Sequence, residues 1–231
     1  MASQRGITLL ELLIILVVIA IIVTIALPSL LSSRMSANES AALGTIRQIL
    51  QSQVQFASRR EADLNRNGTG EFGTFGEMSG NVAVRAASGG TKFLDPGVIN
   101  PSFRAISPMG EMFRDGYYFR IYLPGTTGEG LNELPGGGAD PDVDPDRAEA
   151  TWCVYAWPAN YGATGRRTFF ANQLGDILFT DSSTYSGPGA PIPAGAAFVK
   201  PGPGGNIDGL LAVNLEGRDD NNWRTTARSY R

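Results

Sequence analysis

A nearly uninterrupted apolar run at the N-terminus is the feature that most constrains the fold of this chain. Between Ile7 and Leu31 the only formally charged side chain is Glu11, and the stretch from Leu12 to Leu27 is apolar apart from Thr24. A helix of about 25 residues rises about 1.5 Å per residue, which is enough to cross a bilayer core of about 30 Å. The run is too long for a β-strand. We therefore predict a membrane-spanning helix.

Two simple interpretations of this segment leave Glu11 unexplained. A secretory signal peptide has a shorter apolar region followed by a cleavage site, whereas this run reaches Pro28 and continues into a helical pattern. An ordinary signal anchor explains Arg5, which would hold the N-terminus in the cytoplasm. It gives Glu11 no role. Because Glu11 lies near the start of the run, its carboxylate would simply reach the lipid headgroups.

A third interpretation gives Glu11 a partner. If the chain is cut between Gly6 and Ile7, Ile7 carries a new α-ammonium one helical turn from Glu11. A carboxylate in apolar surroundings is tolerated when it is paired. The ammonium belongs either to the same chain or to the next subunit in a packed array, where the pair would fix the axial register.

The segment "GITLLELLIILVVIAIIVTIALP" resembles the N-terminus of type IV pilins and of the pseudopilins of type II secretion systems. Gly6, Glu11, the apolar span and Pro28 share the spacing of that motif. The resemblance implies that residues 1–6 are a leader, that prepilin peptidase cleaves after Gly6, and that Ile7 is N-methylated. It also implies that Glu11 and Pro28 serve assembly. One departure is Ile7, because the first mature residue is commonly Phe or Met.

The residues after Pro28 favour a continued helix. Proline cannot donate to the helical ladder, so we expect a kink or local melting at Pro28, and the simpler alternative is that the membrane helix ends there. Beyond it, an apolar stripe recurs at spacings of three or four residues, which is typical of one helical face. The stripe consists of Leu43, Ile46, Leu50, Val54 and Ala57. We predict a helix over 7–58 that lays this face on a sheet.

The rest of the chain, 59–231, is expected to form one globular domain, so that the fold is α+β with an antiparallel sheet. Strands are predicted at 116–125 and 150–158, a hairpin at 166–181 turning at Leu174-Gly175-Asp176, and a weaker strand at 209–217. The 29 glycines and 14 prolines predict a loop-rich domain. Gly/Pro-rich loops are expected between the strands, at 124–146 and 186–206.

The stretch "DLNRNGTGEFG" is a candidate calcium loop. Oxygen-bearing residues alternate in it, and Gly68 occupies the sharp-turn position, as in the first half of an EF-hand loop. Thr74 stands where the bidentate Glu of an EF-hand belongs, so a true EF-hand is excluded. An Asn-Gly loop without an ion is the alternative. The candidate ligands are Asp63, Asn65, Asn67, Thr69 and Glu71.

The stretch "DPDVDPDRAE" is a second candidate. Its aspartates occupy every second position, so an extended backbone would place the carboxylates on one face, where they repel unless a cation lies among them. The alternative is a solvated acidic loop. The candidate ligands are Asp140, Asp142, Asp144 and Asp146. Pseudopilins and some pilins carry a loop calcium, so the resemblance favours calcium as the cofactor.

Composition argues against catalysis. The chain has no histidine and only two lysines, Lys92 and Lys200, which removes Ser-His-Asp and Cys-His chemistry and His-ligated metals. We predict that the protein is not an enzyme. Cys153 is the single cysteine, so no intrachain disulfide exists, and its apolar neighbours predict an inert core position. A net charge of −3 without a basic cluster speaks against nucleic-acid binding.

These features predict a structural subunit of a type IV pilus or pilus-like filament, with a pseudopilin of a secretion system as the alternative and a membrane-tethered calcium-binding domain as a third. The expected partners are identical or related pilin subunits, prepilin peptidase, the inner-membrane assembly machinery and, before assembly, membrane lipid. The expected location is the inner membrane with a cytoplasmic N-terminus, and then an extracellular or periplasmic filament.

Overall fold

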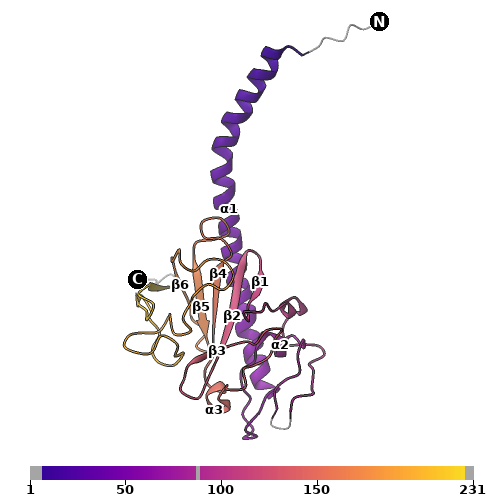
Figure 1. The fold of residues 1–231 in the computed structure, drawn as a ribbon, viewed down its shortest axis with the longest axis vertical. Helices are drawn as coiled ribbons and strands as arrows, with labels where there is room; N and C mark the ends of the chain where they lie inside the picture. The colour runs from indigo at the N-terminus through magenta and orange to yellow at the C-terminus, as the bar shows by residue number, and fades with distance from the viewer. Residues whose placement is uncertain (1–6, 87–88, 227–231) are drawn as a thin grey trace.

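The computed structural model describes residues 7–86 and 89–226 and contains one dominant helix, α1 (Leu9–Ser58). The first half of α1 projects from the molecule as a stalk, and the second half lies against the globular part (Figure 1). The predicted α+β class is confirmed. The boundary predicted at residue 59 coincides with the end of α1. The second half of α1 nevertheless packs into the core of the globular part.

The start and the end of α1 have local causes. Thr8 is the N-cap, with an extended backbone and a side chain that accepts from the Glu11 N–H. At the other end the Arg59 N–H bonds to the Gln55 carbonyl, and Arg60 takes a left-handed φ of 52°, which cannot continue a helix. Pro28 lies inside the helix without interrupting it, so neither local melting nor termination at Pro28 occurs.

The buried face of α1 overlaps the predicted one in part. Ile46 of the predicted stripe is fully buried and Leu43 and Leu50 pack against the core, whereas Val54 is 63% exposed. The buried face also includes polar residues that contact loops: the Ser52 hydroxyl donates to the Val98 carbonyl, and Gln53 exchanges two hydrogen bonds with Gly73. Apolar periodicity missed the polar part of this face, because Ser52 and Gln53 are buried through hydrogen bonds to distant backbone. The buried residues are Ala42, Thr45, Ile46, Ile49, Ser52, Gln53 and Phe56.

The sheet is antiparallel throughout, in the order β1-β2-β4-β5-β6-β8-β7, with β3 also paired to β2. The strands are β1 (Met112–Arg114), β2 (Tyr117–Pro124), β3 (Gly130–Asn132), β4 (Cys153–Pro158), β5 (Thr168–Asn172), β6 (Ile177–Thr180), β7 (Leu215–Glu216) and β8 (Asn222–Thr225). Short helices lie in the loops: α2 (Phe75–Met78), the 3-10 helix η1 (Pro101–Arg104) and α3 (Pro145–Ala148).

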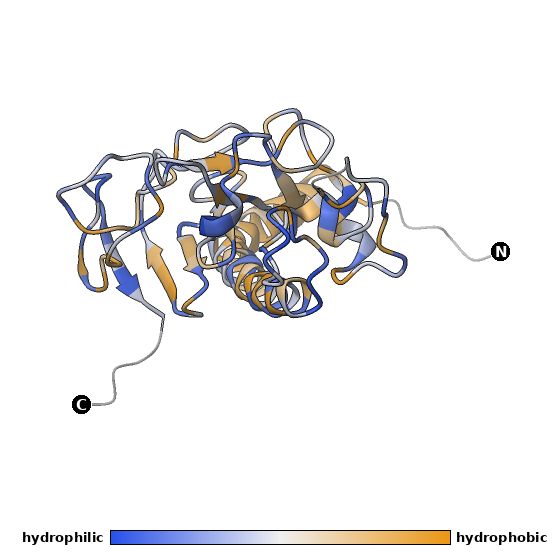
Figure 2. Cartoon of the chain, turned by 90° about the horizontal axis from the view of Figure 1, so that it is seen from below, coloured by the Kyte–Doolittle hydropathy of each residue, from blue (hydrophilic) through white to orange (hydrophobic). Residues whose placement is uncertain are grey.

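The central strands are covered on both faces. One face packs with α1 around Ile46, Ile49 and Phe56, and the other packs with the C-terminal segment around Phe198 and Trp223. Every residue of β4 is therefore buried, and its sequence lacks the alternation of a half-exposed strand. Viewed along α1, the helix lies beside the sheet, with polar loops around both (Figure 2).

The strand predictions are confirmed for β2, β4 and the β5–β6 hairpin, whose turn holds Gly175 at φ 83°. The predicted strand at 209–217 was too long, because only Leu215–Glu216 forms a strand there. Three short strands were not predicted: β1, β3 and β8. Each has three or four residues, too few to produce a clear alternation.

The C-terminal segment is closed without a disulfide. The Arg218 guanidinium donates to the carbonyls of Val199, Pro203, Asn206 and Asp208. The next residue, Asp219, accepts from the Tyr185 hydroxyl at 2.7 Å and from the Trp223 indole at 3.1 Å. Two adjacent charged side chains, Arg218 and Asp219, thus hold the loops of the C-terminal segment together through hydrogen bonds.

Candidate functional site

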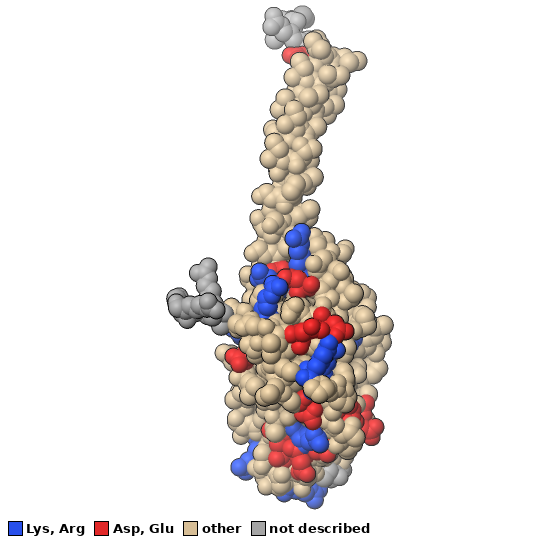
Figure 3. Space-filling model, turned by 90° about the vertical axis from the view of Figure 1, so that its left-hand side faces the viewer, with Lys and Arg blue, Asp and Glu red and all other residues tan. Residues whose placement is uncertain are grey.

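The exposed half of α1 is the most unusual surface of the molecule. Its large apolar side chains from Ile7 to Leu31 are between 42% and 82% exposed. Within the described residues α1 is the one helix long and apolar enough to cross a membrane. The stalk carries no charged group between Glu11 and the globular part (Figure 3). Such a surface is stable only in lipid or against other apolar helices.

Glu11 closes a capping box with Thr8. Its carboxylate accepts from the Thr8 N–H at 3.1 Å and from the Thr8 hydroxyl at 3.2 Å, while the Glu11 N–H donates to that hydroxyl at 3.2 Å. The sequence Thr8-Leu9-Leu10-Glu11 carries the signature of this motif, which the sequence analysis missed. Gly6 lies outside the described residues. Ile7, the first described residue, is 76% exposed.

Four of the five candidate ligands in the first calcium loop lie on one turn, and Glu71 does not. The Asp63 carboxylate accepts from the Gly68 N–H at 3.1 Å, while Asn65 accepts from the Asn67 N–H and Asn67 from the Thr69 N–H. Glu71 is fully buried and is held by the Leu64 N–H and by Arg85. The loop therefore folds through its own backbone donors.

The second acidic stretch does not form a single carboxylate face. Asp140 accepts from the Asp142 N–H, Asp144 caps α3 by accepting from the Arg147 N–H, and Asp146 lies within α3. The prediction assumed an extended backbone. Because α3 begins at Pro145, Asp146 lies on a helical turn and does not share one extended face with the earlier aspartates. Proline at the first helical position and aspartate before it are both typical of a helix start.

The two acidic stretches nevertheless meet. The Asn65 amide donates to Asp146 at 2.6 Å and to Glu149 at 2.9 Å, and the Asn67 amide donates to Glu149 at 2.8 Å. Among the described residues, no group of three or more acidic, histidine or cysteine side chains is arranged to hold a metal. One oxygen here lacks a partner: Asp63 Oδ1 is buried and accepts no hydrogen bond. The junction of the two stretches thus offers oxygen atoms of several kinds rather than a carboxylate cage.

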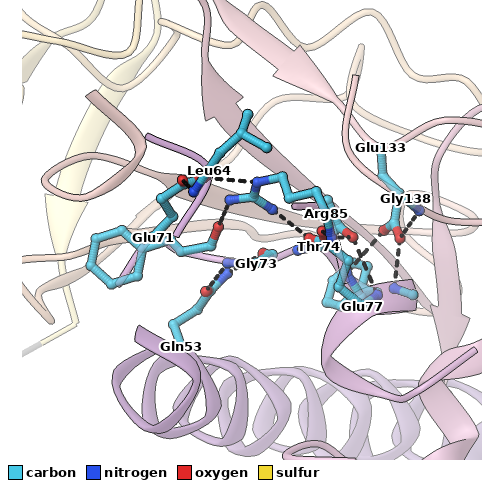
Figure 4. A network of polar contacts seen from close by, with 12 residues as sticks. Gln53, Leu64, Glu71, Gly73, Thr74, Glu77, Arg85, Glu133 and Gly138 are labelled. Carbon is cyan, nitrogen blue, oxygen red and sulfur yellow. Dashed lines mark hydrogen bonds and ion pairs between the residues drawn. The ribbon is translucent and has the colours of Figure 1, made fainter. Parts of the chain in front are cut away.

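A buried polar network fastens these loops to α1 (Figure 4). Arg85 bridges Glu71 and Glu77 at 2.9 and 2.5 Å and donates to the Phe72 carbonyl. Both carboxylates are at most 1% exposed, so their charges depend on Arg85 and on backbone donors. The network positions the segment between α1 and β1.

Glu133 occupies the adjacent position. Its carboxylate accepts from the backbone N–H groups of Phe75, Gly76 and Gly138 at 3.1, 2.6 and 3.2 Å. Burial raises the pKa of Glu133 to about 7, although the three backbone donors act in the opposite direction. Glu77 lies near enough to add to the increase. This residue was not predicted, because two of its three partners belong to α2, more than fifty residues earlier in the chain.

Cys153 confirms the prediction of an inert core position. The thiol is fully buried on β4, and burial raises its pKa well above the ordinary value. Burial of this kind disfavours the thiolate, which is the reactive form. The short contact of its sulfur is with the Ala194 carbonyl at 3.8 Å.

Two family models match the chain, one at the N-terminus and one over most of the rest. The prokaryotic N-terminal methylation motif matches residues 1–27, which include Gly6, Ile7 and Glu11. The chain therefore carries the prepilin signature of type IV pilins and pseudopilins. It belongs to the family described as protein of unknown function (DUF2950), whose model matches residues 24–185, more than half of the chain. No curated protein and no solved structure matched the chain.

Proposed function

We propose that this protein is a structural subunit of a type IV pilus or pilus-like filament, inserted in the membrane through α1 and assembled after removal of residues 1–6. The observation that carries the proposal is the exposed apolar face of α1, which begins at the capped Glu11 and runs to Leu31. Fully burying one Leu or Ile side chain contributes about 1.5–3 kcal/mol relative to water, so once these helices leave the membrane a bundle is strongly stabilised over separate subunits in water.

Glu11 has a specific part in this assembly. In the described chain its carboxylate is bonded to Thr8 and remains exposed. Cleavage before Ile7 would create an ammonium near it, and in a bundle the ammonium of a neighbouring subunit is the partner that would hold the register. A charge removed from water in such a bundle is tolerated only when it is paired.

Replacement of Glu11 separates the pairing from the capping. Glutamine at this position keeps the capping box and removes the charge. We expect Glu11→Gln and Glu11→Ala to insert into the membrane normally and to lose filaments, as seen by electron microscopy. Thr8→Ala is the matched control, because it weakens the cap and keeps the carboxylate, so its filaments should form. Normal filaments in Glu11→Gln would refute the pairing.

A pseudopilin of a secretion system is the second candidate within this class, and the same motif supports it. Both candidates need prepilin peptidase, related subunits and an inner-membrane assembly machinery as partners. Sequencing of the mature N-terminus separates both from a membrane-tethered domain, because a filament subunit should begin at Ile7 and a tethered domain at Met1 or Ala2. The filament would lie outside the membrane, in the periplasm or extracellular space.

We further propose that the junction of the two acidic stretches binds calcium. Asp63 Oδ1, the side-chain oxygens of Asn65 and Asn67, and loop carbonyls are the oxygens that a calcium ion would take, since calcium accepts carboxylate, amide and backbone oxygens together. The unpartnered Asp63 oxygen supports this proposal. Glu71 is excluded from the ligand set because Arg85 holds it in the interior.

A further inference from the structure

A groove lies where α1 leaves its exposed apolar segment and enters the globular part. We call it the neck groove; its volume is about 460 Å³. One wall is a face of α1, and the others come from the loop between β4 and β5 and from the end of β6. The lining residues are Ser32, Met35, Ser36, Glu39, Tyr161, Arg166, Arg167 and Asp181.

The position of the neck groove relates it to the membrane. Its first residue, Ser32, directly follows Leu31, the last residue of the apolar run. When the apolar run spans the bilayer, the groove lies at the level of the lipid headgroups on the far side from the N-terminus. Basic and acidic side chains lie together just below the stalk on this side of the molecule (Figure 3).

Two of the four charges in the groove are already satisfied. Glu39 accepts from the backbone N–H groups of Arg166 and Arg167 at 3.0 and 3.4 Å. The Arg167 guanidinium lies 3.8 Å from the Glu39 carboxylate and stacks on the Phe179 ring, with its central carbon 4.8 Å from the ring centroid. These contacts fix the wall of the groove and pair the two charges with each other, so that they offset one another.

The other two charges are unpaired. Within the described part of the chain, the side chains of Arg166 and Asp181 make no hydrogen bond or ion pair, and both are exposed to the groove. Hydroxyl groups of Ser32, Ser36 and Tyr161 line the same space. The groove therefore offers one cation, one anion and neutral hydrogen-bonding groups.

We propose that the neck groove binds the zwitterionic headgroup of a phosphatidylethanolamine-type lipid while the subunit is held in the membrane. Arg166 would take the phosphate through a charge-assisted hydrogen bond, and Asp181 would take the primary ammonium. An anionic headgroup would leave Asp181 unpaired and repelled, and a quaternary ammonium has no N–H to donate to it. The proposal rests on membrane insertion of α1 and not on filament assembly.

Native mass spectrometry of the full chain in detergent tests the proposal, with phosphatidylethanolamine, phosphatidylcholine and phosphatidylglycerol added in equal amounts. We expect preferential retention of phosphatidylethanolamine. Arg166→Gln and Asp181→Asn should each weaken that retention about tenfold, the loss expected for one charge-assisted hydrogen bond. The backbone N–H of residue 166 still donates to Glu39 in Arg166→Gln, so the groove wall is preserved.

Arg34→Gln is the matched control, because Arg34 is exposed at the same level of α1 but does not line the groove. Its lipid retention should equal that of the wild type. Equal retention of the three lipids, preference for phosphatidylglycerol, or an equal loss in Arg34→Gln would overturn the proposal. Cross-linked dimers lost in Arg166→Gln with unchanged lipid retention would instead assign the groove to a subunit interface. None of these outcomes alters the Glu11 filament test.

Discussion

Glu11 and Glu133 show how the surroundings of a residue decide the role of a carboxylate. Glu11 is exposed at a helix N-terminus, where a negative charge interacts favourably with the helix dipole and its capping bonds. Glu133 also meets the N-terminus of a helix, α2, but it is 1% exposed. The loss of hydration there outweighs the three backbone hydrogen bonds, so the protonated, neutral form of Glu133 is favoured.

The raised pKa of Glu133 predicts a pH dependence of stability. Its pKa is about 7 in the folded chain and about 4.5 unfolded, so the folded state binds the proton more tightly. Stability from this group is fully present below about pH 4.5 and is lost as the pH rises through about 7, a change of about 3 kcal/mol. Denaturant unfolding from pH 4 to 8 should show the loss in wild type and a flatter profile in Glu133→Gln.

The control for this experiment is Asp176→Asn, which removes an exposed carboxylate at the tip of the β5–β6 hairpin. Its pH profile should follow that of the wild type. If Glu133→Gln keeps the full pH dependence, another group is responsible and the assignment to Glu133 is wrong.

At the scale of elements, the sequence predicted those parts whose signals are local. The apolar run, the Gly6–Glu11 spacing and the β5–β6 turn each lie within one segment, and they located α1, the cleavage motif and a hairpin. The buried face of α1 was predicted only in part, because Gln53 and Ser52 form hydrogen bonds with Gly73 and Val98, which no helical periodicity reveals. The capping box at Thr8 was a local signal and could have been found.

Substitution of Gly44 tests whether a neighbouring helix packs closely against the exposed side of α1 in a filament. It is exposed in the middle of the helix, and nothing lies within 4 Å of a Cβ built there. Alanine should therefore raise helix stability by about 1 kcal/mol, a shift of about 2–4 °C in the melting temperature of the full chain in detergent. A filament that needs close approach of helices at Gly44 would assemble poorly in Gly44→Ala despite the added stability.

Gly70→Ala is the contrasting variant, because a Cβ there would lie 1.9 Å from the Ala57 carbonyl oxygen at the end of α1. It should lower the melting temperature. Unchanged stability in Gly44→Ala would contradict the expectation for a helix interior, and normal filaments with raised stability would show that no neighbour approaches closely at Gly44.

At the scale of the whole molecule, contacts between distant segments decide the form of the loops. Asn65 and Glu149 are 84 positions apart, and their hydrogen bond joins the two acidic stretches that the sequence presented as separate. The C-terminal segment is also held by contacts between separate loops, through the hydrogen bonds of Arg218 and Asp219. Neither arrangement has a local signature, so neither could be predicted from spacing.

The junction of the acidic stretches yields the last prediction. Calcium that binds only the folded chain stabilises it by about 2.7 kcal/mol at a hundredfold excess over the dissociation constant, or about 5–10 °C in melting temperature. We expect this shift when calcium is added to chelator-treated full-length protein in detergent. Asp63→Asn should abolish the shift, since it replaces the carboxylate whose Oδ1 lacks a partner, whereas Asp176→Asn should keep it. A melting temperature independent of calcium would exclude this site, and would leave Arg85, Glu71 and the amides of Asn65 and Asn67 as sufficient to hold the loops.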